Sequence, residues 1–219
     1  FSKCFLFVSI QLNESLLISI VMIEYLISLD VSLFQFMNSG LSNTLFDILM
    51  PKITHQNNWI IPLCILFYIL LFKTGKRGKI AFIILLIGFG ITDYFSAQYI
   101  KPFIGRIRPS HSMLDSIHLL VNKGGKWSFP SNHAANSFVL ATILSYFFSQ
   151  WKYPLFILAS LIGFSRIYVG VHYPGDVVFG ALLGYCIAWI LLSIWVILKM
   201  RELKRGRTWV WYTSDTINK

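Results

Sequence analysis

The chain has 219 residues, a length that suits one domain or a small pair of domains. Hydrophobic residues make up 56% of it and charged residues only 13%, against roughly 25% charged in soluble globular proteins. This composition excludes an intrinsically disordered chain, a collagen and a small disulfide-stapled domain, and it favours a protein that crosses a membrane several times. The net charge is +10, but the basic residues stand in short runs between apolar stretches. We therefore expect anionic lipid or a phosphorylated ligand, and not nucleic acid, as the partner.

The N-terminal part, residues 1–58, has the least regular pattern. Residues 5–29 are apolar enough to form a membrane span, so they are a candidate span. Four polar residues interrupt them: Gln11, Asn13, Glu14 and Glu24. The chain begins with Phe, and Met22 is a candidate for the natural start. Residues 30–50 have mixed polarity and predict one or two short helices that lie in the membrane interface.

Five later segments predict membrane-spanning helices, because a bilayer core of about 30 Å requires about 20 apolar residues in a helix. They are residues 59–72, 80–100, 134–148, 154–164 and 177–198. The predicted fold class is therefore all-α: a polytopic membrane helical bundle with five spans, a sixth candidate span and short interfacial helices. The expected division is an N-terminal segment over residues 1–58, a core bundle over residues 59–200 and a basic cytoplasmic tail over residues 201–219.

The basic clusters predict the orientation, because short loops rich in Lys and Arg stay in the cytoplasm. One cluster occupies residues 73–79, and another occupies residues 199–207, directly after the last span. With both clusters inside, the order of the spans places residues 101–130 and 165–176 on the outer side. In a bacterium this predicts a multi-pass protein of the cytoplasmic (inner) membrane, with these outer loops facing the periplasm.

Three groups of polar residues gather on this outer side. Their chemically useful members are Lys101, Arg108, Ser131, Asn132, His133, Arg166, His172 and Asp176. Arginine matches phosphate oxygens bidentately, and lysine adds a point charge. Ser131 and Asn132 open a predicted helix, whose free N–H groups favour an anion. These residues predict a phosphate site, while the two histidines and Asp176 are candidates for nucleophile, general acid and orienting partner.

The spacing of these residues also resembles that of a known family. The patterns K-x6-R-P from residue 101, P-S-x-H from residue 130 and S-R-x5-H-x3-D from residue 165 are similar to the three signatures of the type 2 phosphatidic acid phosphatases. The resemblance implies an integral-membrane lipid phosphatase with a core related to that of vanadium haloperoxidases. It implies that His172 forms a phosphohistidine, that Asp176 orients it, and that His133 serves as acid and then base. Asn132 departs from the pattern, which usually has Gly there.

The resemblance further implies a bacterial lipid substrate: lipid A 1-phosphate, undecaprenyl diphosphate, phosphatidylglycerol phosphate or phosphatidate. We expect no metal or other cofactor and no obligate protein partner. Two other functions stay open, namely a vanadate-dependent haloperoxidase-like enzyme and a membrane protein that binds anionic lipid without catalysis. Asp93 is a charged residue inside a predicted span, where such residues are usually functional, and we expect it to form a hydrogen bond between helices.

Overall fold

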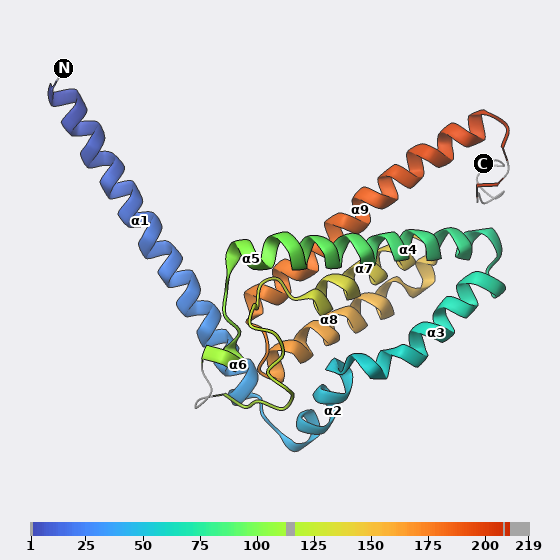
Figure 1. The fold of residues 1–219 in the computed structure, drawn as a ribbon, viewed down its shortest axis with the longest axis horizontal. Coiled ribbons are helices and arrows are strands. Elements are labelled where there is room, and N and C mark those ends of the chain that lie inside the picture. The colour runs from blue at the N-terminus through green and yellow to red at the C-terminus, as the bar shows by residue number, and fades with distance from the viewer. Residues whose placement is uncertain (1, 113–116, 208, 211–219) are drawn as a thin grey trace.

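A computed structural model describes residues 2–112, 117–207 and 209–210, with side chains from residue 16 onward. Every regular element within these residues is a helix, so the all-α prediction is confirmed. Figure 1 shows a bundle of helices from which α1, at the N-terminus, leans away.

The N-terminal helix α1 (Ser2–Gln35) is continuous and passes into a π-helical turn, η1 (Phe36–Gly40). The stretch Leu16–Gly40 is long and apolar enough to cross a membrane, so the sixth candidate span is helical. The short helix expected within residues 30–50 is α2 (Thr44–Thr54), whereas residues 30–35 continue α1. This difference arises because the Asp30 carboxylate finds hydrogen-bond partners inside the protein and does not depend on water at the interface.

The five predicted spans each coincide with a helical stretch. They are η2 (Gln56–Trp59) with α3 (Ile60–Tyr68) and η3 (Ile69–Lys73), α4 (Gly75–Phe95) with η4 (Ser96–Ile100) and α5 (Lys101–Ile104), α7 (Asn132–Phe147), α8 (Lys152–Tyr168) and α9 (Pro174–Lys204). Three of them qualify as spans by length and composition: Gln56–Lys73, Gly75–Ile104 and Pro174–Lys204. α7 and α8 have 16 and 17 residues, which is short for a span. The small helices α6 (Pro109–Ser112) and η6 (Ser149–Trp151) lie between the spans.

The core is built around α7, which packs against α4, α8 and α9. Its side chains Val139, Ile143 and Phe147 are fully buried in the main apolar cluster. Two glycines of α9 allow close approach, because a Cβ at Gly180 would collide with the backbone of Ser131, which caps α7, and one at Gly184 with the backbone of Ala135. This tight contact fixes the start of α7 against the first turns of α9.

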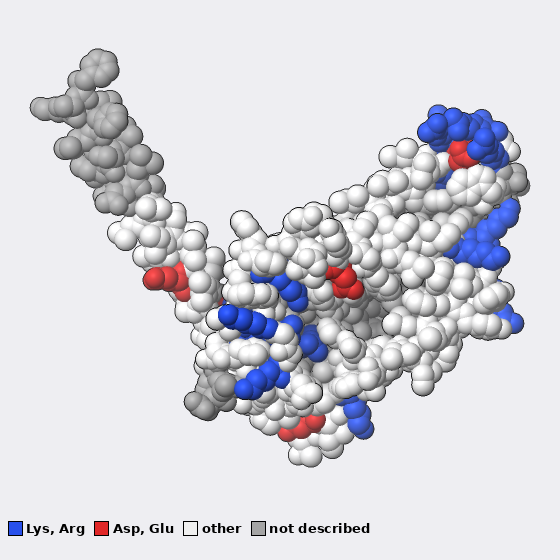
Figure 2. Space-filling view, viewed as in Figure 1, with Lys and Arg blue, Asp and Glu red and all other residues white. Residues whose placement is uncertain are grey.

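The two ends of the bundle differ in chemistry. The end of α8 and the starts of α7 and α9 meet beside α5 at one end (Figure 1). The start of α4 and the end of α9 lie at the other, where Lys and Arg side chains crowd the surface (Figure 2). All eight residues predicted to act on phosphate belong to the first end.

Candidate active site

A histidine and a carboxylate are paired at the start of α9. Asp176 lies in the first turn of the helix, where its carboxylate Oδ2 accepts a hydrogen bond of 2.9 Å from the backbone N–H of Tyr173. His172 directs its Nδ1 atom to the same oxygen at 3.5 Å, and both side chains are buried. This arrangement favours the tautomer with the proton on Nδ1, which leaves a lone pair on Nε2.

The surroundings keep the His172 imidazole neutral. Burial lowers the pKa of His172 to about 3, and the positive charges of Arg108 and Arg166 act in the same direction. The hydrogen bond to Asp176 opposes this shift without overcoming it. At neutral pH the Nε2 atom is therefore unprotonated, as a nucleophile must be.

Three residues that the sequence did not single out complete this pair. The Ser128 hydroxyl donates to Asp176 Oδ2 and lies 3.4 Å from His172 Nδ1. One guanidinium nitrogen of Arg106 donates to Asp176 Oδ1 at 2.9 Å, and the other donates to Asp30 Oδ2 at 2.5 Å. Asp176 is therefore held from several elements at once. No spacing rule distinguishes Arg106 from its neighbours or marks Ser128, and Asp30 only ends an apolar segment.

Two buried arginines supply positive charge close to the His172–Asp176 pair. The Arg108 guanidinium donates from Nε to the Trp127 carbonyl at 3.0 Å, and burial lowers its pKa. Arg166 donates to the Thr54 hydroxyl at 2.6 Å, and its Nε atom is buried with no hydrogen-bond partner among the described residues. Because two buried cations repel each other, a bound anion would stabilise both. Lys101 is half-buried and close enough to interact electrostatically with both arginines.

The start of α7 contributes the second predicted motif. Ser131 caps the helix, since its hydroxyl oxygen accepts the N–H of Ala134 at 3.5 Å, and its own N–H donates to the Asp176 carbonyl. His133 is half-buried and lies within electrostatic range of the same cations and of His172. The site thus brings all three motifs together at one end of the bundle.

Asn132 is the predicted site residue whose side chain points elsewhere. Its amide nitrogen donates to Asp93 Oδ1 at 3.0 Å, and its amide oxygen accepts from the Ser96 hydroxyl at 2.6 Å. The carboxamide therefore binds α4 and its π-helical extension η4. Asp93 forms the expected hydrogen bond between helices.

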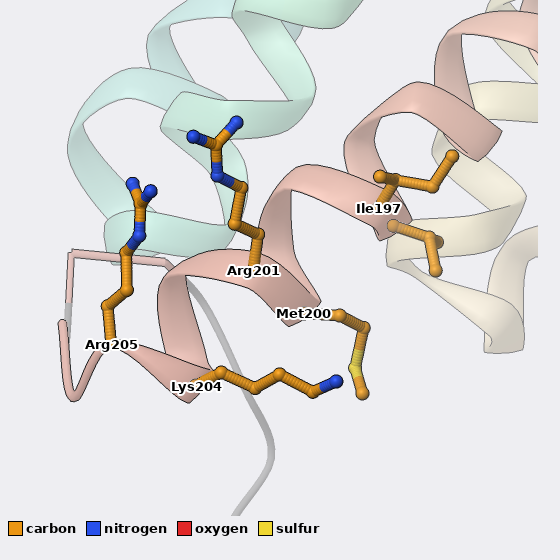
Figure 3. A pocket seen from close by; sticks show the side chains of 6 residues that line it. Ile197, Met200, Arg201, Lys204 and Arg205 are labelled. Atoms are coloured by element: carbon orange, nitrogen blue, oxygen red, sulfur yellow. The ribbon is translucent and has the colours of Figure 1, made fainter.

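A cavity of about 390 Å³ adjoins His133 and Asn132 between α3, α4, α7 and α8. Most of its wall is apolar, which suits lipid tails. A second hollow lies at the far end of α9, where apolar and basic side chains alone line it and Arg201 and Arg205 extend in the same direction (Figure 3). That hollow is lined by no histidine, carboxylate, hydroxyl or thiol among the described residues. The described residues hold no cluster of three His, Cys, Asp or Glu that could bind a metal ion.

A helical bundle with two histidines, a carboxylate and several cations gathered at one end fits a class of protein, the integral-membrane phosphatases. Residues 78–199 match the PAP2 superfamily, and the chain belongs to this family of membrane lipid phosphatases. It is 32% identical to a lipid A 4'-phosphatase of Bacteroides thetaiotaomicron, over 79% of this chain and 80% of that protein. It is 33% identical to an undecaprenyl-diphosphatase of Sulfolobus acidocaldarius, over 78% and 81%. The crystal structure of Aquifex aeolicus LpxE is similar, with a TM-score of 0.64 and 30% identity over 75% of this chain and 95% of that chain.

Proposed function

We propose that the protein removes a phosphate group from a membrane lipid through a covalent phosphohistidine on His172. The observation that carries this proposal is the neutral, buried His172, whose Nδ1 faces Asp176 while Arg108 and Arg166 are buried close by. A nucleophile and cations are then in place for in-line attack on phosphorus.

The reaction has two halves. Nε2 of His172 attacks the phosphorus atom, and the bond from phosphorus to the lipid oxygen breaks as the new N–P bond forms. His133 protonates the departing oxygen, so the lipid leaves as an alcohol, or as a monophosphate when the substrate is a diphosphate. His133 then takes a proton from water, whose oxygen attacks phosphorus and breaks the N–P bond. Inorganic phosphate leaves, and His172 is neutral again.

The remaining residues of the three motifs stabilise charge. Lys101, Arg108 and Arg166 surround the phosphoryl oxygens, on which negative charge is spread in the transition state. The N–H groups that open α7 after Ser131 add a helix N-terminus directed at the same anion. Since phosphoryl transfer depends mainly on positioning and electrostatics, this set is sufficient for the chemistry.

The substrate we favour is a phosphate group of lipid A, since the lipid A 4'-phosphatase relative aligns with most of this chain. Undecaprenyl diphosphate, phosphatidylglycerol phosphate and phosphatidate are the other candidates. We place the active site on the outer face of the bacterial inner membrane, because both basic clusters lie at the opposite end of the bundle (Figure 2). The cavity beside His133 would receive the lipid while its tails remain in the bilayer.

The test is phosphate release by purified protein in detergent, with EDTA present and each of the four lipids supplied separately. We expect release from at least one lipid, with none from His172→Ala. No phosphate release from any of the four lipids, or equal release by His172→Ala, would overturn the proposal. Vanadate distinguishes the haloperoxidase alternative: it should inhibit the phosphatase, whereas it would activate a haloperoxidase.

A further inference from the structure

The cavity beside His133 contains an acidic side chain that the proposed reaction does not use. Asp93 lies within the span Gly75–Ile104, its side chain is exposed, and it lines this cavity. A carboxylate at membrane depth is costly, so such a residue is expected to bind something that the protein needs. Its Oδ1 atom accepts hydrogen bonds of 3.0 Å from the amide nitrogens of both Asn132 and Asn136.

These hydrogen bonds orient the Asp93 carboxylate but occupy only one of its two oxygens. Among the described residues, nothing donates a hydrogen bond to Asp93 Oδ2. The amide oxygen of Asn136, which also lines the cavity, is buried and has no hydrogen-bond partner there either. The cavity therefore presents two acceptor oxygens from neighbouring helices, and the buried one, on Asn136, is unfavourable unless a ligand donates a hydrogen bond to it.

The rest of the cavity wall is mostly apolar, with Gln56 and Ser137 as its other polar residues. Trp59 lines the cavity, and its indole N–H already donates to the Ile53 carbonyl at 2.7 Å, so its ring is left to make apolar contacts. Phe89 and Leu140, further along α4 and α7, line the cavity with hydrocarbon. A ligand that fits this lining combines hydrogen-bond donors, a flat apolar face and hydrocarbon.

We propose that Asp93, Asn136 and Trp59 form a headgroup subsite for a sugar that carries the phosphate to be removed, so that the enzyme prefers phosphorylated glycolipids. Sugar hydroxyl and amide N–H groups donate to the two oxygens, and the C–H face of the ring packs on the indole. A prenyl diphosphate offers only acceptor oxygens and hydrocarbon, and its second phosphate would be repelled by Asp93. This inference rests on the proposed phosphatase function and adds which lipids the enzyme prefers.

The experiment compares KM and kcat on two lipids, lipid A bearing its phosphates and undecaprenyl diphosphate. Asp93→Asn keeps an oxygen for Asn132 and Asn136 but removes the charge, and Asn136→Ala removes the second acceptor. For each variant we expect KM for lipid A to rise about tenfold, the size of one hydrogen bond to a charged or buried polar group, with kcat nearly unchanged. KM for undecaprenyl diphosphate should stay constant or fall. Glu24→Gln, which alters an exposed acid in α1, is the matched control and should change neither lipid.

Several outcomes overturn the inference. An equal loss on both lipids would mean that Asp93 only holds the start of α7 in place, as would a fall in kcat with KM unchanged. Wild-type turnover of undecaprenyl diphosphate or another lipid without a sugar, and not of lipid A, would reject the sugar subsite and leave the phosphatase intact. No turnover of any of the four candidate lipids would reject both. Melting temperatures in detergent check folding. If Asp93→Asn does not fold, Asn136→Ala and Trp59→Leu carry the test with the same expected rise in KM.

Discussion

At the scale of single residues, Asp176 is the group on which the site is organised. It accepts hydrogen bonds from the Ser128 hydroxyl, Arg106 and the backbone of Tyr173 while facing His172. Sequence spacing could predict the His172–Asp176 pair, because four residues across a turn into a helix bring the two within reach. Spacing could not predict Ser128 or Arg106, since their contacts to Asp176 cross 48 and 70 positions of the chain.

Removing the nucleophile should differ from removing its partner. We predict that His172→Ala abolishes phosphate release, whereas Asp176→Asn reduces kcat by roughly 10²- to 10⁴-fold, because the amide misorients the imidazole but leaves Nε2 in place. Steady-state rates with the best lipid substrate measure both variants. Equal residual rates in the two would contradict the assigned roles.

The buried His172 also predicts a pH dependence of stability. Its pKa falls from 6.5 to about 3 in the folded protein, because burial disfavours the charged ring. Between these pH values the unfolded chain binds a proton that the folded chain does not, so stability is lost as the pH falls through this window. We expect the melting temperature of His172→Asn in detergent to decline less steeply than that of wild type over the same range. Parallel curves for the two proteins would count against a neutral, buried His172.

At the scale of elements, α1 is joined to the site through its C-terminal part. Asp30 accepts from Arg106 and, at 2.7 Å, from the backbone N–H of Gly175, directly beside Asp176. Phe34 packs edge-on against the Tyr173 ring at 5.4 Å between centroids. The apolar runs of the sequence predict the helices, but the continuation of α1 past residue 30 depends on these contacts and could not be predicted from local polarity.

This junction predicts that a residue distant in sequence positions the catalytic pair. Asp30→Ala releases Arg106 and the first turn of α9, so kcat should fall between about 10- and 100-fold while KM changes little. Asp30→Asn, which can still accept from Gly175, should lose less activity, and Glu24→Gln on the same helix should lose none. A wild-type kcat in Asp30→Ala would show that α1 does not position Asp176.

At the scale of the whole molecule, the two ends of the bundle carry different kinds of residue. One end buries a histidine, a carboxylate and two arginines from two of the three motifs, and the other carries the exposed basic clusters (Figure 2). The motifs and the spacing of apolar segments were sufficient to predict this polarity and the family. The cavity between α3, α4, α7 and α8 was not predictable, because its wall combines residues of four helices whose packing no local pattern encodes.

The central claim is that the phosphoryl group passes through His172. The most direct measurement incubates the protein with lipid labelled in its phosphate, quenches the reaction in alkali, where phosphohistidine survives, and locates the label by peptide mass spectrometry. We predict the mass of one phosphoryl group on the peptide that contains His172, with no label in His172→Ala. Label on a different residue, or sustained phosphate release by His172→Ala, would contradict the account.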